Sequence, residues 1–148
     1  MSNRKHTLSK STLIRSIQCS KSLYLYKNNY NLRDKPDTVQ QQRFDRGHRV
    51  GKLAHQLFPN GKDCSPPNPF SYDESVSATK LLIQQQFPVI YEAAFKYNGI
   101  LVALDMLTYK DGKWYAHEVK SSFRISNTYL LDAAIQYYII QKNWIAVS

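Results

Sequence analysis

Apolar and polar positions alternate with a period of two over residues 89–97, 100–109 and 113–122. This period is typical of β-strands, in which successive side chains point to opposite faces. Asn98-Gly99 and Asp111-Gly112 lie between these segments, and both dipeptides are typical of two-residue hairpin loops. We therefore predict an antiparallel meander of three strands.

Helical periodicity occupies four other segments, residues 8–29, 38–58, 72–86 and 128–142. The first predicts one or two short helices with Ser9 or Ser11 as the N-cap. In the second, Val50, Leu53, Ala54, Leu57 and Phe58 recur at helical spacing and predict a buried stripe. Residues 143–148 predict the start of a further strand.

The two hairpin loops also predict the strand register. With two-residue loops, Asp105 lies opposite Glu118 on one neighbouring strand and opposite Glu92 on the other. Lys120 lies one step further along the same face, because residues two apart on a strand share a face. Directly opposed like charges are destabilising, and clustered carboxylate oxygens suit Mg²⁺ or Mn²⁺. This row of three carboxylates predicts a divalent-metal site. A bulge or a longer loop would shift the register, and the alternative for Glu118 and Lys120 is a solvated polar face.

The length of 148 residues predicts a single domain, and 43% hydrophobic residues suffice for a core. No apolar run is long enough to span a membrane, and the basic N-terminus leads into no long apolar stretch typical of a secretory signal. Two cysteines cannot build a disulfide framework or a four-cysteine metal site. These features favour a cytoplasmic protein.

The net charge of +9 is concentrated in the N-terminal part of the chain. Residues 1–60 carry twelve Lys and Arg against three Asp and Glu, whereas residues 61–148 carry eight of each. This distribution predicts an acidic polymer, such as a nucleic acid, as the partner.

Asp105, followed on the next strand by Glu118-Val119-Lys120, resembles the signature of the PD-(D/E)XK nuclease superfamily. The resemblance spans residues 9–145 and is to the RecB-like branch, which includes the exonucleases of CRISPR adaptation. Within that branch, the chain is most similar to an uncharacterised bacterial family. The further residues that match the branch, in the same order along the chain, are Gly51 and His55 on a helix, Glu92 on the preceding strand, and Gln136 with Tyr137 or Tyr138 on the following helix.

The resemblance implies an α/β (α+β) fold with a restriction-endonuclease-like core, in which helices flank a mixed sheet containing the antiparallel meander. A basic helical part over residues 1–60 would precede a sheet and catalytic core over residues 88–148. The implied activity is a metal-dependent nuclease that acts on DNA with a metal-activated water. The implied catalytic residues are Asp105, Glu118, Lys120 and Glu92, and the implied ligands of Mg²⁺ or Mn²⁺ are His55, Asp105, Glu118 and the Val119 carbonyl. The residues expected to contact nucleic acid are Gln136, Tyr137, Tyr138, Arg46 and Lys52.

Relatives in CRISPR adaptation bind an iron–sulphur cluster through a cysteine near the position of Cys19 and three near the C-terminus. This chain carries only Cys19 and Cys64, so we expect no cluster and predict that Cys19 is a buried helix residue. The resemblance also implies that relatives continue past Ser148, which indicates a fragment or a truncated chain.

Four functions are compatible with these residues: a DNase, an RNA-directed nuclease, a nucleic-acid-binding module that does not cut, and a protein-interaction domain. The complete set of Glu92, Asp105, Glu118 and Lys120 favours catalysis, and the charge distribution disfavours the interaction domain. The pattern does not distinguish endonuclease from exonuclease, and it predicts no oligomeric state.

Overall fold

Both predicted hairpins form with two-residue loops. In the computed structural model, which describes residues 7–69, 71–143 and 145, β3 (Val89–Tyr97) pairs antiparallel with β4 (Ile100–Lys110), and β4 pairs antiparallel with β5 (Lys113–His117). All four loop residues have positive φ, as a type I′ turn requires at both central positions. The predicted register is confirmed for both pairs, but β5 ends at His117 rather than at residue 122.

Two short strands that the hydrophobic pattern does not predict complete the mixed sheet. β1 (Leu8–Ser9) pairs parallel with β4, and β2 (Lys62–Asp63) pairs parallel with β3. β1 and β5 share one edge of β4: β1 pairs with its first two residues, and β5 pairs from Met106 onward. Asp105 lies in the interval of β4 between these two pairings.

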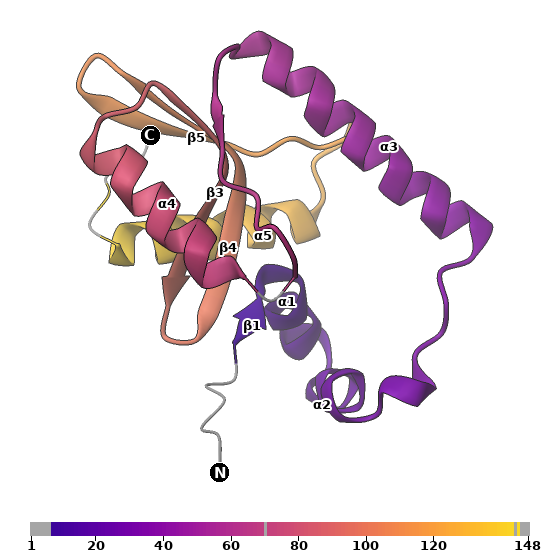
Figure 1. Ribbon diagram of the computed structural model, residues 1–148. Helices are drawn as coiled ribbons and strands as arrows, with labels where there is room; N and C mark the ends of the chain where they lie inside the picture. The colour runs from indigo at the N-terminus through magenta and orange to yellow at the C-terminus, as the bar shows by residue number, and fades with distance from the viewer. Residues whose placement is uncertain (1–6, 70, 144, 146–148) are drawn as a thin grey trace.

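The helices follow the predicted order (Figure 1). Their bounds are α1 (Lys10–Gln18), α2 (Ser20–Asn28), α3 (Thr38–Ala54), α4 (Tyr72–Gln84) and α5 (Asn127–Lys142), with short 3₁₀ helices at η1 (Tyr30–Leu32) and η2 (His55–Leu57). Ser9 is the N-cap of α1, as predicted, and its hydroxyl accepts a hydrogen bond from the Thr12 backbone N–H. None of the helices in the described part of the chain is long and apolar enough to cross a membrane.

The core lies between β3–β4 and two helices, with α4 in front of the strands and α5 behind them (Figure 1). Leu82 of α4 and Ile139 and Ile140 of α5 belong to the same buried cluster as the central strands. Residues on both faces of the strands are buried. Ala93, Phe95, Val102 and Leu104 belong to one alternating set, and Ile90, Leu107 and Trp114 belong to the other. The carboxylates of Glu92, Asp105 and Glu118 are therefore surrounded by apolar side chains, because helices cover both faces of the sheet.

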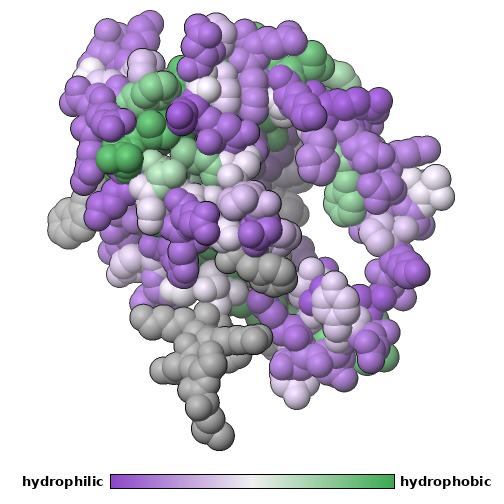
Figure 2. Space-filling model, viewed as in Figure 1, coloured by the Kyte–Doolittle hydropathy of each residue, from purple (hydrophilic) through white to green (hydrophobic). Residues whose placement is uncertain are grey.

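The predicted buried stripe over residues 50–58 is confirmed only in part, because two of its five residues are exposed. Leu53 is 60% exposed and Leu57 is 75% exposed, whereas Ala54 is buried and Phe58 packs beside Tyr91. Figure 1 shows α3 extending away from the sheet, and Figure 2 shows open space between α3 and the body of the molecule. Only the C-terminal end of α3 reaches the core, so its other apolar positions have nothing in the described chain to bury them.

The prediction that Cys19 is a buried helix residue is also wrong, because Cys19 is exposed and lies at the junction between α1 and α2. Cys64, by contrast, is buried in the core. The further strand predicted over residues 143–148 falls on a segment of which only Asn143 and Ile145 lie among the described residues.

Gly61 makes a close contact that a larger residue would break. A Cβ at this position would lie 2.3 Å from Cζ of Tyr91, whose ring is stacked on His55 at a centroid distance of 3.8 Å. The Tyr91 hydroxyl also accepts a hydrogen bond from the Gly61 N–H at 3.1 Å. The ring is therefore held on several sides and has little room to move.

We predict that Gly61→Ala lowers the free energy of unfolding by about 1–3 kcal/mol, the usual cost of overpacking. Gly51→Ala is the matched control, because a Cβ there meets no atom within 4 Å and alanine is favoured over glycine inside a helix. Urea unfolding of the two variants measures the difference. Equal stability of Gly61→Ala and the wild type would contradict this account of the contact.

Candidate functional site

The interval of β4 between its two edge partners positions the site. Asp105 projects there, and its Oδ2 accepts a hydrogen bond at 2.5 Å from the backbone N–H of Val119, which follows the end of β5. This bond holds the segment Glu118–Lys120 beside β4 although the regular pairing has stopped at His117. The predicted neighbourhood of Asp105 and Glu118 is thus retained by a side chain rather than by the strand ladder.

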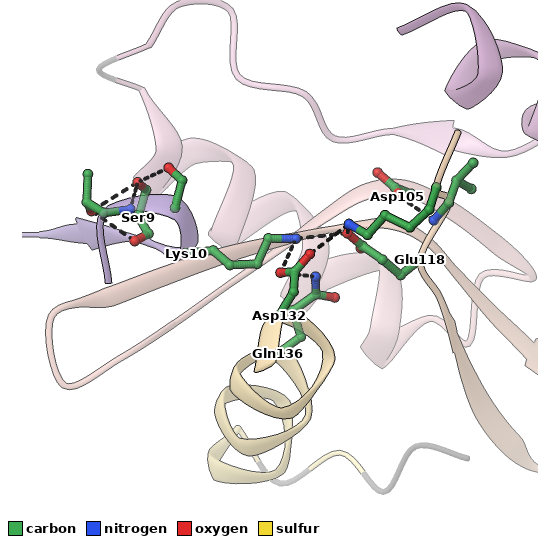
Figure 3. A network of polar contacts seen from close by, with 10 residues as sticks. Ser9, Lys10, Asp105, Glu118, Asp132 and Gln136 are labelled. Atoms are coloured by element: carbon green, nitrogen blue, oxygen red, sulfur yellow. Dashed lines mark hydrogen bonds and ion pairs between the residues drawn. The ribbon is translucent and has the colours of Figure 1, made fainter. Parts of the chain in front are cut away.

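Two lysines and two carboxylates form a closed ring of ion pairs beside Asp105 (Figure 3). Lys10 Nζ lies 3.0 Å from Glu118 Oε1 and 2.9 Å from Asp132 Oδ1. Lys120 Nζ lies 2.7 Å from Asp132 Oδ2 and also pairs with Glu118 Oε1. The salt bridge between Glu118 and Lys120 confirms that the two side chains share a side of the chain, as predicted.

The second carboxylate oxygen of Glu118 is left without a partner. Oε2 is buried and has no hydrogen-bond partner in the described part of the chain. A buried charged oxygen without a partner is costly, so such an atom indicates a ligand or ion. Burial, and next the Glu118 charge, raise the pKa of Asp105, although the Val119 N–H, Lys10 and Lys120 oppose the shift. Burial and the neighbouring Glu118 charge thus both disfavour the ionised form of Asp105.

Glu92 adds a third carboxylate to this negative region. It lies in sequence between Tyr91 and Ala93, which pair with Met106 and Leu104, but it adopts a φ of 51° inside β3. A non-glycine residue in this conformation costs about 1–3 kcal/mol and is often found at functional sites. Burial, and then the charges of Asp105, Asp63 and Glu118, raise the pKa of Glu92 to about 7.

The ring of ion pairs keeps Lys120 protonated. Burial alone lowers the pKa of Lys120, but the hydrogen bonds and charges of Asp132 and Glu118 outweigh it and raise the pKa above its usual value. Burial raises the pKa of Asp132, but the hydrogen bonds and charges of Lys120 and Lys10 together outweigh burial, so the net shift of the pKa is downward. Lys120 is thus an ammonium donor at neutral pH and has no free lone pair with which to accept a proton.

The residues present fit a magnesium-type ion better than a fully ligated metal cage. Among residues 7–69, 71–143 and 145, no three His, Cys, Asp or Glu side chains are grouped so that they could share one ion. Mg²⁺ is usually held by one or two carboxylates and keeps several waters. Asp105 and the free oxygen of Glu118 are the groups at this position that could hold such an ion.

His55 does not join the carboxylates in the observed arrangement. Its ring lies flat against Tyr91, with an interplanar angle of 4°, and its backbone carbonyl accepts a hydrogen bond from the Tyr91 hydroxyl. Gly51, one turn before His55, makes no close contact, because a Cβ built there would meet no atom within 4 Å. His117 is half-buried beside Phe58 and hydrogen-bonded to Thr108.

The five residues expected to contact nucleic acid lie in different environments. Gln136 is buried on α5, where its amide donates to Asp132 Oδ1 at 3.3 Å. Tyr137 and Tyr138 on the same helix are 51% and 52% exposed. Arg46 and Lys52 are exposed on α3. The structure therefore brings Gln136 into the polar network and leaves the other four at the surface.

Sequence reasoning missed Lys10 and Asp132 as members of the site. Asp132 had a usable signal, because it lies four residues before Gln136 and so shares its helix face. Lys10 had none: it is one of many lysines in the basic N-terminal part, and only the docking of β1 against β4 brings it to Glu118.

Comparisons of the chain with protein-family models, with curated proteins and with solved structures found no match.

The raised pKa of Glu92 predicts a pH-dependent stability. The folded chain holds a proton on Glu92 up to about pH 7, whereas the unfolded chain releases it near pH 4.5. The contribution of Glu92 to the free energy of unfolding therefore falls as pH rises through this interval. Glu92→Gln, which cannot ionise, should raise Tm at pH 8 in EDTA and change it little at pH 5.

Thermal melts at the two pH values measure this difference, with Glu74→Gln as the control because Glu74 is exposed on α4. The same change in Tm at both pH values would show that Glu92 does not ionise at a cost in the folded protein.

Proposed function

We propose that this chain is a divalent-metal-dependent nuclease that hydrolyses phosphodiester bonds in DNA. The observation that carries the proposal is the buried, unpartnered Oε2 of Glu118, next to Asp105 and on the same carboxylate that binds Lys120. The resemblance of Asp105 and Glu118-Val119-Lys120 to the PD-(D/E)XK signature supports the same chemistry.

Asp105, Glu118 and the Val119 carbonyl would hold Mg²⁺ or Mn²⁺. When bound, such an ion supplies a water acidic enough to attack phosphorus and a positive charge beside the scissile phosphate. The negative charge around Asp105 and Glu118 is the feature that favours the ion. Glu92, with its pKa of about 7, can hold or release a proton at the edge of this region near neutral pH.

Lys120 has the protonation state needed to stabilise negative charge. As an ammonium it can donate to a phosphate oxygen or orient the attacking water. Its positive charge would stabilise the negative charge that develops on the phosphoryl oxygens in the transition state. Its raised pKa disfavours a role as the base that removes the proton from water. Asp132, with Lys10 beside it, positions Lys120 and limits its rotation.

The basic N-terminal part would bind the phosphate backbone. Lys and Arg side chains that neutralise phosphates give a sequence-independent, salt-sensitive affinity. Arg46 and Lys52 are exposed on α3, the helix that extends away from the sheet, and can reach a polymer that the acidic site alone would repel.

One observation favours a second candidate, a nucleic-acid-binding module that does not cut. Glu118 and Lys120 are engaged with Lys10 and Asp132, and no three ligand side chains are grouped among the described residues. A site that stayed in this closed arrangement would bind nucleic acid through its basic part without hydrolysing it. RNA is a further alternative substrate, because the carboxylates and lysines named above act on the phosphate and do not distinguish ribose from deoxyribose.

We predict that the wild type cleaves labelled single- or double-stranded DNA with Mg²⁺ or Mn²⁺ and not with EDTA. Glu118→Gln and Lys120→Ala should each lower the rate by about 10²–10³-fold, the usual effect of removing an electrostatic catalytic group. Lys113→Ala is the matched control, because Lys113 is exposed at the β4–β5 hairpin, away from the ring of ion pairs. Parallel reactions with RNA test the choice of substrate. Salt-sensitive binding with no cleavage under any condition would support the non-catalytic module instead.

Binding by the basic part is tested separately from cutting. In EDTA, the double variant Arg46→Ala/Lys52→Ala should bind a DNA oligonucleotide several-fold more weakly, with a slope of log affinity against log salt reduced by about one per lost phosphate contact. Fluorescence anisotropy at several salt concentrations measures both quantities, and Lys113→Ala again serves as the control. An unchanged affinity and slope would place the nucleic-acid path elsewhere.

A further inference from the structure

The first residue of α1 is held in place by both the strand before it and its own helix cap. β1 pairs Leu8 with Ile100 and Ser9 with Leu101, and the Leu8 N–H donates to the Gly99 carbonyl at 2.7 Å. The hydroxyl of buried Thr12 donates to the Ser9 carbonyl at 2.9 Å. Lys10 therefore starts from a backbone that is fixed to β4, beside the interval that contains Asp105.

The Lys10 ammonium lies where a cation bridges two carboxylates. It is within 3.0 Å of Glu118 Oε1 and within 2.9 Å of Asp132 Oδ1, and its side chain is 22% exposed. Figure 3 shows it extending from α1 to the point where Glu118 and the α5 residue Asp132 meet. Lys120 takes the other oxygen of Asp132 and shares Oε1 of Glu118. Both oxygens of Asp132 and one of Glu118 are thus already neutralised.

The balance of charge then leaves room for one divalent ion. Lys10 and Lys120 each pair with both Glu118 and Asp132, whereas the Asp105 carboxylate accepts a hydrogen bond from the Val119 N–H. Both lysines therefore lie on the Asp132 side of Glu118, and within the described residues no lysine pairs with Asp105 or with Oε2 of Glu118. A second divalent ion between Glu118 and Asp132 would have to displace Lys10 or lie against it, and like charges at such distances repel.

We propose that Lys10 is a fixed internal cation of this site, which occupies the place of a second metal ion and limits the site to one divalent ion. The inference rests on the proposed function, because it assumes that Asp105 and Glu118 hold a metal. It makes Lys10 a positioning residue: it holds Glu118 by Oε1, which leaves Oε2 as the oxygen without a partner, and it holds Asp132 beside Lys120.

The test counts bound metal and needs no cleavage. Isothermal titration calorimetry with MnCl₂, with free Mn²⁺ followed by electron paramagnetic resonance, should give one site per wild-type chain. Lys10→Gln should gain a second site, or bind the first ion about tenfold more tightly because one nearby positive charge is lost. Lys10→Arg should behave as the wild type because it keeps the charge.

Lys27→Gln is the matched control: it removes the same charge from an exposed lysine of the N-terminal part, whose Nζ donates to the backbone of Thr7. Two ions per wild-type chain, or a Lys10→Gln variant that binds Mn²⁺ as the wild type does, would overturn the role of Lys10 and leave the nuclease proposal standing. No Mn²⁺ binding by the wild type would overturn the nuclease proposal itself. If Lys10→Gln does not fold, the wild-type stoichiometry still decides between one ion and two.

Discussion

The two lysines that share Glu118 and Asp132 connect three parts of the chain. Lys10 begins the first helix, Glu118 and Lys120 follow the last strand of the meander, and Asp132 lies in the second turn of α5. Removing one member of a buried, paired set leaves an uncompensated charge, which typically costs about 3–5 kcal/mol. The ring therefore fixes how α1 and α5 are placed around the end of β5, and the geometry of the site depends on it.

The sheet provides the place for this ring by leaving part of one strand edge without a partner. β1 and β5 both pair with the same edge of β4, and Asp105 lies between their pairings. On the other side of β4, Glu92 adopts the left-handed conformation within β3. Strained backbone and crowded carboxylates both lower stability, so in the absence of a ligand the site is a less stable part of a well-packed core.

Basic and acidic residues lie in different parts of the molecule, and this separation affects how a polyanion would bind. The N-terminal part is strongly basic, and α3 carries exposed basic residues away from the sheet, whereas the centre of the site is acidic. A phosphate backbone is attracted to the first and repelled by the second unless a cation is bound there. Lys10 belongs to the basic part by sequence and to the acidic site by position, and so joins the two.

The sequence by itself determined the helices, the meander and its register. The period of the hydrophobic pattern and the chemistry of Asn98-Gly99 and Asp111-Gly112 are local properties, and local properties suffice to set hairpin geometry. The same register placed Glu118 near Asp105 before any contact was known. The prediction that the last strand continues through Lys120 is wrong, because β5 ends at His117.

The tertiary structure determined the features that the period of the hydrophobic pattern does not encode. A helical stripe predicts that a face can be buried but not that a partner exists, so Leu53 of α3 and Leu57 of η2 are exposed. Two-residue strands such as β1 are too short to show a pattern, yet β1 alone carries Lys10 to the site. The partners of a long, flexible ammonium side chain depend on distances between segments rather than on neighbours in sequence. The carboxylates could therefore be found from the sequence, whereas the cations that complete their surroundings could be found only from the fold.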